Sequence, residues 1–385
     1  MKFAFFSAQY LPTIGGIERY TRNLALALTS QGHHVTIIAS QLPGVPAREV
    51  DDGVEVMRLP SWPVMAGRFP VPRPAHESRA MLADLWESGV DFAMINTRFW
   101  PLSIWAARAC HRRGVPAVVV EHGSGYLSLG NPVLNLASHV YEHLAARLVR
   151  HWVPQFCAVS KNSARWLATF GIKARGVLYN AVDVDEIESL ARLGRWDARA
   201  ECGLDDAARL VVYLGRLIPE KGIREMLQAM RTVREKCPDA VLLLAGEGPM
   251  LDELRSLDQD GVFFVGALDH AKALSLLQQA DAFCMPSYSE GFSTVVLEAA
   301  ALGTFIVTTP VGGTAELLDA DYPGLVASPD PASVADVLIQ ALSDPDWCAA
   351  GVRQALAKVE STFTWEKTAQ ELIGVATAIQ THRNP

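Results

Sequence analysis

Short apolar runs alternate with longer segments of helical spacing along the chain. Runs in the first half are rich in β-branched and aromatic residues, which is typical of buried strands: KFAFFSA, HHVTIIAS, VEVMRLP, FAMINT and AVVVEHG. Between several of them lie segments such as IERYTRNLALALTSQG, whose apolar residues recur at the spacing of an amphipathic helix. Strands that alternate with helices predict a parallel sheet covered by helices on both faces.

The same alternation begins again in the second half of the chain. Strand-like runs such as ARLVVYLGRL, AVLLLAGEG and AFCMPS are separated by helical segments such as IREMLQAMRTVREK and TVVLEAAALG. A chain of 385 residues also suits two domains better than one. The sequence therefore predicts an α/β protein of two doubly wound, Rossmann-like domains, residues 1–175 and 183–362. We expect a C-terminal helix, residues 365–382, to pack back on the first domain.

Each half opens with a strand that runs into a glycine-containing loop and then a helix. In the first half the loop carries Gly15 and Gly16, and in the second Arg216 and Lys221 flank the turn. A helix N-terminus attracts phosphate, and glycine lets the phosphate approach closely. A glycine turn is commonly plain turn chemistry, and neither segment carries a GxGxxG or P-loop motif. Any ligand should lie at the carboxyl ends of the strands, where these loops are.

The segment YSEGFSTVVLE places two carboxylates eight positions apart, Glu290 and Glu298. Ser293 and Thr294 are typical of a helix start, and Ser293 is expected to cap that helix. Glu290 would then lie in the loop before the helix and Glu298 in its second turn. With cations on the same sheet edge, the carboxylates are better placed to hold sugar and ribose hydroxyls than to approach phosphate. This pattern favours a nucleotide sugar as the ligand.

Several motifs in order resemble one family over nearly the whole chain, the retaining GT-B glycosyltransferases of glycosyltransferase family 4 (glycosyl transferases group 1). The matching segments are GGIER, EHG, CAVSKNSARWLATFG, VLYNAVD, GRLIPEKG, LLLAGEGP, FFVGAL and SEGFSTVVLEAAALG, the last with the E-x7-E spacing of that family. Two positions depart from the family pattern, Ser293 and Ala181, where that pattern has glycine. The resemblance implies two Rossmann-like domains facing across a cleft.

The resemblance also implies roles for individual residues. Glu290 would contact the transferred sugar, Glu298 would hold the ribose, and Arg216 with Lys221 would neutralise the diphosphate. The remaining donor contacts would come from Gly16, His122, Gly266, Leu268, Gly291, Phe292 and Ser293. His122, Glu290, Arg216 and Lys221 would form the catalytic set, the departing phosphate would take the proton of the acceptor on the same sugar face, and no metal or other cofactor would be needed.

The charge distribution favours certain classes of partner, and the cysteine content indicates the redox state of the thiols. Residues 1–175 carry 18 Lys and Arg against 11 Asp and Glu, whereas the whole chain has a net charge of −8. A basic first half favours an anionic acceptor or a phospholipid surface, although chance and a solvated acidic surface explain the imbalance equally well. Six dispersed cysteines without a CxxC pair indicate reduced, buried thiols, and no apolar run is long enough to span a membrane. We expect a cytoplasmic protein that binds no nucleic acid.

Two further segments are candidates for the acceptor side. The loop at 61–74 is too apolar for a solvated loop and too rich in proline for a strand, and it carries Arg68 and Arg73. Residues 133–150 predict a helix with Leu and Val on one side, which either packs on the core or faces an anionic membrane. Arg98 and Trp100, which follow the strand FAMINT, are candidates to line the acceptor cleft.

Other functions fit parts of the pattern. The sequence HVYEH at 139–143 matches an inverted zinc-protease motif, but no further ligand is evident. A sugar-nucleotide epimerase of the same fold would use His122 and Glu290 as acid and base, and a non-catalytic carbohydrate-binding protein would need neither. The reading that the motifs favour is transfer of a hexosyl unit from a UDP- or GDP-linked sugar to a glycan or lipid-linked acceptor, in cell-surface polysaccharide or glycolipid synthesis.

Overall fold

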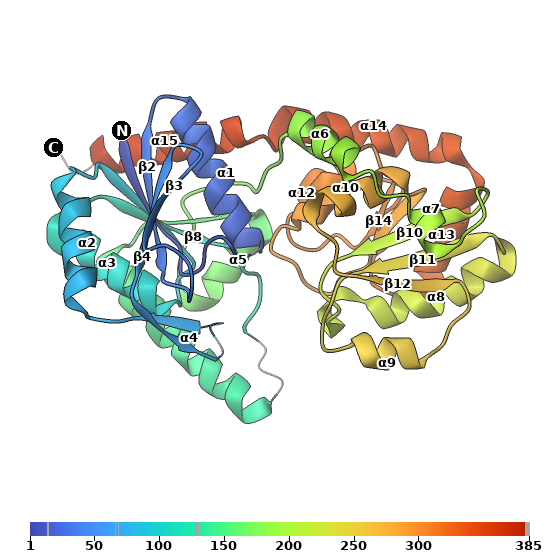
Figure 1. Cartoon of the computed structure of the whole chain (residues 1–385), viewed down its shortest axis with the longest axis horizontal. Helices are drawn as coiled ribbons and strands as arrows, with labels where there is room; N and C mark the ends of the chain where they lie inside the picture. Colours follow the sequence, from blue (N-terminus) through green and yellow to red (C-terminus); the bar gives the residue numbers. More distant parts are fainter. Residues whose placement is uncertain (14, 66, 68, 128–130, 382–385) are drawn as a thin grey trace. The chain divides into compact units, whose positions relative to one another are not determined.

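The computed structural model describes residues 1–13, 15–65, 67, 69–127 and 131–381. The chain divides into two compact units (Figure 1). The first unit contains Met1–Asn180 together with the C-terminal segment that begins at Trp365, and the second contains Ala181–Thr364. The sequence predicted this division within a few residues, including the return of the last helix to the first unit.

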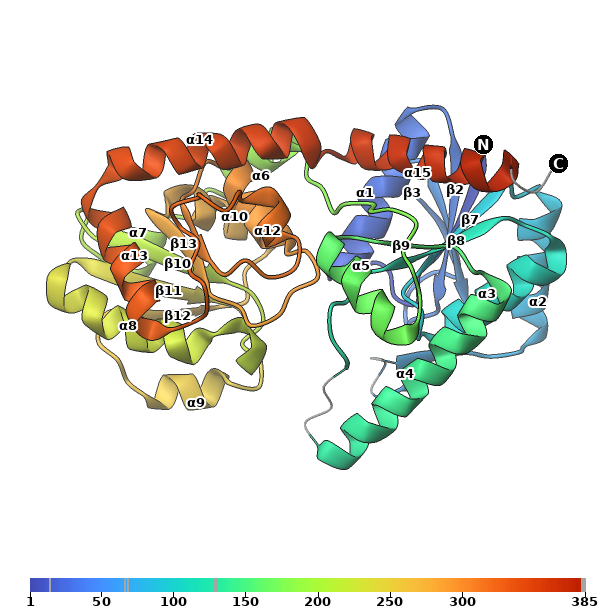
Figure 2. The same ribbon diagram turned by 180° about the vertical axis from the view of Figure 1, so that it is seen from behind.

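The first unit is built around a seven-stranded sheet of order β3-β4-β2-β1-β7-β8-β9, in which β3 alone is antiparallel to its neighbour (Figure 2). Its strands are β1 (Lys2–Phe6), β2 (His34–Ser40), β3 (Arg48–Asp51), β4 (Val54–Leu59), β5 (Ser61–Val64), β6 (Phe69–Pro72), β7 (Phe92–Asn96), β8 (Ala117–Glu121) and β9 (Phe156–Ala158). Its helices are α1 (Gly16–Ser30), α2 (His76–Glu87), α3 (Pro101–Arg113), α4 (Pro132–Trp152), α5 (Lys161–Leu167), η1 (Ala168–Phe170) and α15 (Trp365–Thr381).

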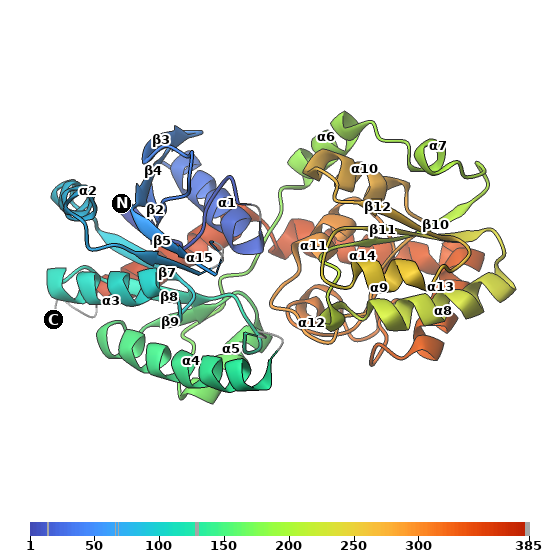
Figure 3. The same ribbon diagram turned by 60° about the horizontal axis from the view of Figure 1, so that its bottom comes forward.

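The order of strands in this sheet reverses between β1 and β7. The chain moves from β1 to β2 and β4 on one side, and from β7 to β8 and β9 on the other. Because crossovers between parallel strands are right-handed, helices of the two halves cover opposite faces. Helices α1 and α15 pack together on one face, and α3 packs beside α4 on the other (Figures 1 and 3). The loops after β1 and β7 therefore flank the position where doubly wound sheets bind ligands.

The second unit contains a five-stranded parallel sheet of order β12-β11-β10-β13-β14. Its strands are β10 (Arg209–Leu214), β11 (Ala240–Ala245), β12 (Val262–Gly266), β13 (Ala282–Met285) and β14 (Ile306–Thr308). Its helices are α6 (Val184–Gly194), α7 (Ala198–Cys202), η2 (Pro219–Lys221), α8 (Ile223–Lys236), α9 (Leu251–Ser256), α10 (His270–Gln279), α11 (Thr294–Ala301), α12 (Thr314–Leu317), α13 (Pro331–Ser343) and α14 (Pro345–Thr362). Here the strand order reverses between β10 and β13, so the loops after these two strands flank the second expected ligand position.

Strand β5 pairs with β6 in an antiparallel hairpin, so the expectation that the segment 61–74 is too rich in proline for strands is wrong. The register sets Ser61 opposite Pro72 and Pro63 opposite Pro70. These are alternate pairs of the ladder, and alternate pairs of an antiparallel ladder exchange no hydrogen bonds. The prolines thus fall where a missing N–H costs the hairpin nothing. Arg68 of this segment lies outside the described residues.

Helix α4 exposes the side that its sequence suggested for core packing. Leu136, Val140, Leu144 and Leu148 follow one another at every fourth position, and each is at least 45 % exposed. The buried side of the helix is formed by small and polar residues, Ser138, Glu142, Ala145 and Ala146, together with Val149. The core-packing alternative is therefore wrong for Val140, Leu144 and Leu148. None of the described helices combines the length and the apolar composition needed to cross a bilayer.

Candidate functional site

Loops at the carboxyl edge of the second sheet pack against one another through glycine. Gly222 ends the loop after β10 with φ +67°, and a Cβ there would come within 2.0 Å of the Pro286 carbonyl oxygen after β13. Gly312 has φ +58°, and a Cβ there would lie 2.4 Å from the Glu290 carbonyl oxygen. Larger residues fit neither the dihedral angle nor the space. These two glycines hold the loop that carries Glu290 between its neighbours.

Glu290 and Lys221 form an ion pair across the reversal of strand order in the second sheet. Lys221 ends the turn η2 after β10, and Glu290 lies in the loop after β13. The Ser287 hydroxyl donates to the same Glu290 oxygen at 3.1 Å. Both partners of the ion pair are only slightly exposed. The carboxylate and the ammonium are therefore fixed together in one polar group at the expected ligand position.

Arg216 lies on the same edge and has a different environment. Its side chain is exposed, and within the described part of the chain it takes part in no ion pair. The Tyr213 hydroxyl donates to the Arg216 carbonyl at 2.8 Å and so fixes its backbone. Arg216 therefore offers a guanidinium to solvent from the same loop that carries Lys221, which suits an incoming anion.

Glu298 is buried in the second turn of α11, as its spacing predicted, and hydrogen-bonds to His270 Nε2 at 2.8 Å. His270 begins α10 directly after the loop that contains Gly266 and Leu268. The Glu298 carboxylate is thereby tied to the loop of Gly266 and Leu268, two of the expected donor contacts. Ser293 occupies the N-cap position of α11 but makes no side-chain capping bond, so that part of its expected role is wrong. Gly291 is partly accessible and Phe292 is buried against Phe363.

In the first unit, α1 begins at Gly16 after an extended Gly15. A Cβ at Gly15 would lie 2.4 Å from the carboxylate of Glu18, whereas nothing lies within 4 Å of a Cβ at Gly16. The Glu18 side chain is buried, and this burial raises its pKa. No described atom crowds the Cβ direction of Gly16, which leaves room on that side of a helix N-terminus and suits the phosphate prediction.

His122 follows β8, and its Nε2 lies 2.9 Å from the Asn96 side-chain oxygen. The amide nitrogen of Asn96 donates to the Thr21 hydroxyl at 2.9 Å, and that hydroxyl donates to the Ile17 carbonyl at 2.7 Å. A hydroxyl has one proton, so Thr21 must accept from Asn96. The Asn96 oxygen then faces the ring and accepts from Nε2–H. Hydrogen-bond satisfaction therefore assigns the Nε2–H tautomer to His122 and leaves Nδ1 as an acceptor.

Loss of hydration keeps this imidazole neutral, although the residue is partly accessible. Loss of hydration lowers the pKa of His122 to about 3. The ring of Tyr20 meets it edge-on, with centroids 4.8 Å apart, and the Tyr20 hydroxyl donates to the Leu178 carbonyl at 3.1 Å. A neutral ring with one unprotonated nitrogen can accept a hydrogen bond from a ligand hydroxyl but carries no charge to offer a phosphate.

Arg98 does not line a cleft, which corrects its assignment to the acceptor. It is 1 % exposed and forms ion pairs with Glu121 at the end of β8 and Glu142 on α4. Its guanidinium also lies 3.8 Å from the centroid of the Phe170 ring. Burial is the largest influence on Glu142 and raises its pKa. Arg98 is a structural cation that neutralises carboxylates in the core.

Trp100 remains a candidate to contact an acceptor. It is partly buried, and its ring lies 5.1 Å from that of Phe69 in the β5–β6 hairpin. The proposed HVYEH zinc motif has another explanation. Its Glu142 is engaged by Arg98, and Tyr126 packs on His139 and hydrogen-bonds to His143. Among the described residues, no three His, Cys, Asp or Glu side chains gather as a metal site.

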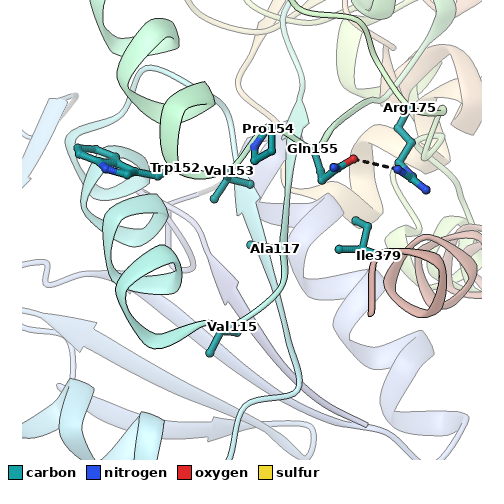
Figure 4. A pocket seen from close by; sticks show the side chains of 8 residues that line it. All are labelled: Val115, Ala117, Trp152, Val153, Pro154, Gln155, Arg175 and Ile379. Carbon is teal, nitrogen blue, oxygen red and sulfur yellow. Dashed lines mark hydrogen bonds between the residues drawn. The ribbon is translucent and has the colours of Figure 1, made fainter. Parts of the chain in front are cut away.

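One cavity of the first unit lies away from the candidate residues (Figure 4). It has a volume of about 270 Å³ and is lined by Ala117 at the start of β8, by Gln155 just before β9 and by Ile379 of α15. Arg175 donates to Gln155 across it at 3.0 Å. The cavity thus lies at the amino ends of the strands, whereas doubly wound sheets bind ligands at the carboxyl ends. It is not a candidate for the nucleotide sugar.

The predicted site residues form two groups, one in each unit. Arg216, Lys221, Glu290 and Glu298 lie on loops and a helix at one edge of the second sheet, and Gly16 and His122 lie at the corresponding edge of the first. Sequence reasoning missed the residues that hold them: Asn96, Thr21, His270 and Ser287. The position of Asn96 at the carboxyl end of its strand could have marked it as a site residue. Its two hydrogen-bond partners, however, are distant in sequence.

Comparison with known proteins gives consistent matches over the two halves. Residues 14–186 match the family described as Glycosyltransferase Family 4, and residues 194–358 match the family described as Glycosyl transferases group 1. A glycogen synthase of Mycobacterium tuberculosis is 28 % identical, over 96 % of this chain and 92 % of the relative. A GDP-mannose-dependent monoacylated alpha-(1-6)-phosphatidylinositol monomannoside mannosyltransferase of Corynebacterium glutamicum is 26 % identical, over 94 % of each chain.

Solved structures share the fold. A sucrose-phosphate synthase from Thermosynechococcus elongatus superposes with a TM-score of 0.79 at 21 % identity, over 99 % of both chains. Anabaena HepE in complex with UDP-glucose superposes with a TM-score of 0.71 at 19 % identity, over 98 % of this chain and 100 % of HepE. At such identities the similarity concerns the arrangement of the backbone, and residue roles must come from the side chains of this chain.

Proposed function

Since the chain belongs to glycosyltransferase family 4 and has the GT-B fold, we propose that it transfers a hexosyl unit from a UDP- or GDP-linked sugar to a hydroxyl of a glycan or lipid-linked acceptor. The observation that carries this proposal is the polar group at the edge of the second sheet. There Lys221 and Glu290 form an ion pair, the exposed Arg216 lies on the same loop as Lys221, and Glu298 of α11 is held by His270 of α10.

The donor diphosphate would lie against Arg216 and Lys221. Cleavage of the bond to the anomeric carbon leaves negative charge on the diphosphate, and these two cations would stabilise that charge. Lys221 already shares its charge with Glu290. An arriving phosphate therefore competes with Glu290 for the ammonium and frees a Glu290 oxygen to accept from sugar hydroxyls. Because the two cations supply this charge, we expect turnover without added divalent metal.

We further propose that the reaction retains the configuration at the anomeric carbon. Glu290 is held at one oxygen by Lys221 and Ser287, which suits a hydroxyl acceptor better than a nucleophile that must move to carbon. The neutral His122 likewise carries no proton to give at Nδ1. The leaving phosphate oxygen would then take the proton of the acceptor hydroxyl on the same face of the sugar.

A thermal-shift panel of UDP-, GDP- and ADP-sugars tests the donor site, followed by product analysis with the stabilising donor. A specific shift with one base supports the assignment, and NMR of the glycoside gives its configuration. Isomerisation of the donor without transfer would indicate an epimerase. The absence of any shift would indicate a protein that does not bind nucleotide sugars.

Two variants examine the residues themselves. Removal of one charge-stabilising donor commonly lowers kcat by about 10²–10³-fold, and we expect this of Arg216→Ala. Glu290→Ala should lower kcat/KM because the hydroxyl contact disappears. Arg231→Ala is the matched control, since Arg231 is exposed on α8 of the same unit away from the sheet edge. If both test variants turned over donor as the wild type does, the assignment would be wrong.

We also propose that the first unit rests on an anionic membrane at the cytoplasmic side. The support is the exposed aliphatic row on α4 and the exposed apolar residues of the hairpin, Trp62 and Val64. The aliphatic row continues into a hollow of about 580 Å³ lined by His143, Arg147 and Arg150 among others. Apolar side chains beside basic ones are typical of helices that lie in a membrane interface.

Co-sedimentation with phosphatidylglycerol-containing vesicles tests this placement. Leu144→Ser should reduce the bound fraction because it removes an aliphatic group from the exposed row. Leu193→Ser is the control, since Leu193 is 70 % exposed on α6 of the other unit. Equal binding of wild type and Leu144→Ser, or no binding at low salt, would refute the membrane proposal.

A further inference from the structure

A second basic hollow of the first unit is lined by residues of α2 and α3. Its volume is about 460 Å³, within the range typical of small-molecule sites. Arg79 of α2 and Arg108, Arg112 and Arg113 of α3 line it, together with Trp86 and Trp105. No carboxylate is among its lining residues. The hollow therefore combines four positive charges with two aromatic rings.

These four arginines differ from others of the same unit. Arg22, Arg48 and Arg58 each form an ion pair with an Asp or Glu. Arg79, Arg108, Arg112 and Arg113 are exposed, and within the described residues none of them forms an ion pair or a side-chain hydrogen bond. Basic residues in the last turn of a helix complement its dipole, which accounts for Arg112 and Arg113. It does not account for Arg79 and Arg108 at the same hollow.

Trp86 is held in place by packing against the core. Trp86 stacks on the buried Phe6, with centroids 6.2 Å apart, and the Arg113 guanidinium lies 5.9 Å from the Trp86 ring. A cation–π contact favours the position of the Arg113 guanidinium over the ring, and a planar guanidinium presents paired N–H groups that match phosphate oxygens. Several arginines that converge without acidic partners concentrate anions at that point.

We propose that the hollow between α2 and α3 binds a phosphate group. It is separate from the proposed donor site, because its residues lie on the surfaces of α2 and α3, whereas the donor contacts are assigned to loops and helix starts at the carboxyl edges of the two sheets. Two sources would present this chemistry, the phosphate of a lipid headgroup and a soluble phosphate. The hollow adds an anion contact to the first unit whichever source supplies it.

The test uses inorganic pyrophosphate as the soluble probe and vesicles of phosphatidylcholine with or without phosphatidylglycerol as the lipid probe. Calorimetric titration is done in an Arg216→Ala background, so that pyrophosphate at the proposed donor site does not contribute. The test variant is Arg108→Gln/Arg112→Gln. The control is Arg165→Gln/Arg353→Gln, which removes the same charge from two exposed arginines on α5 and α14.

We expect the test variant to lose about tenfold or more in affinity in one of the two arms, because two charge-assisted contacts disappear. Loss in the pyrophosphate arm identifies a soluble phosphate, and loss confined to the phosphatidylglycerol vesicles identifies a headgroup. The control should stay within about twofold of its parent, since it changes only the overall charge. Unchanged binding in both arms, or an equal loss in the control, overturns the proposal. Neither result depends on whether the protein turns over a nucleotide sugar.

Discussion

Replacing Thr21 by valine tests how the protein selects the tautomer of His122. The shape of the side chain is nearly kept, and the hydroxyl that receives the Asn96 amide is lost. With Thr21 present, the described arrangement contains three hydrogen bonds: Thr21 to Ile17, Asn96 to Thr21 and His122 to Asn96. Rotating the Asn96 amide by half a turn leaves two, because the single hydroxyl proton must then leave Ile17 for the Asn96 oxygen.

The difference is therefore one buried neutral hydrogen bond, about 0.5–1.5 kcal/mol. At about 1.4 kcal/mol for each factor of ten, it favours Nε2–H over Nδ1–H by about 2- to 10-fold beyond the intrinsic preference of the ring. In Thr21→Val the two amide orientations make the same number of bonds. The ratio of the tautomers should consequently fall by that factor, and Nδ1 of His122 should become an acceptor less often.

Side-chain ¹⁵N NMR of histidine measures this ratio directly, because a protonated and an unprotonated ring nitrogen resonate far apart. Thr29→Val is the matched control, since Thr29 lies on the same helix and donates to the carbonyl four residues earlier at 2.9 Å without touching Asn96. If wild-type His122 were protonated mainly at Nδ1, or if Thr21→Val left the ratio as it is in Thr29→Val, the reasoning would fail. When the ratio falls as expected, kcat/KM for the donor should fall by a similar factor.

Three further results are expected. His122 should stay neutral at pH 5 by NMR, because loss of hydration lowers its pKa to about 3. Its contribution to the free energy of unfolding is complete above about pH 6.5 and is lost as the pH falls toward 3. Protonation of His122 near pH 6.5 in the folded state would contradict this prediction. In urea denaturation, Leu144→Ala should change the free energy of unfolding by less than about 0.5 kcal/mol. Val149→Ala, at a fully buried position of the same helix, should lower it by more than about 1 kcal/mol. Equal losses would show that the exposed side of α4 is packed. Arg98→Met should cost about 3–5 kcal/mol in the same assay because it leaves Glu121 and Glu142 buried without their cation, and a neutral effect would show that these carboxylates are protonated.

Strands and helices of the two sheets were predictable because both faces of a parallel sheet are covered. Runs such as FAMIN and AVLLLA are continuous apolar segments, and the structure buries each residue of β7 and β11. The β5–β6 hairpin was not predictable for the opposite reason. Its prolines are acceptable only at alternate pairs of the ladder, and the register that places them there involves a second strand, so it is absent from the local sequence.

For the candidate site, the placement of the charged residues at one sheet edge was predictable, and that of the polar residues that contact them was not. Glu290, Glu298, Arg216 and Lys221 stand in segments whose spacing and residue type already indicate chemistry, and they all fall at one edge of the second sheet. Asn96 reads as the end of a strand, and its meaning depends on Thr21, which lies 75 residues earlier. A hydrogen bond over such a separation has no local signature.

Long-range contacts also explain why α4 exposes its aliphatic residues and buries its small and polar ones. Its buried face consists of small residues because α3 packs directly against it, and it includes a carboxylate because Arg98 supplies the compensating charge. The resulting ion pairs also organise the loop after β8. Glu121 accepts from the Gly123 N–H at 3.0 Å, and Glu142 accepts from the Leu127 N–H at 3.0 Å.

Arg98 therefore connects the exposed helix to the segment that contains His122. One guanidinium fixes both Glu121, the residue before His122, and Glu142, which anchors the loop that follows. A buried charge is retained only where its partners repay the loss of hydration, and here two carboxylates do so. Because these contacts set the backbone on either side of His122, loss of Arg98 should disturb the position of His122. An Arg98 variant that still folds should accordingly alter the His122 tautomer ratio, whereas Leu144→Ala should leave it unchanged in solution.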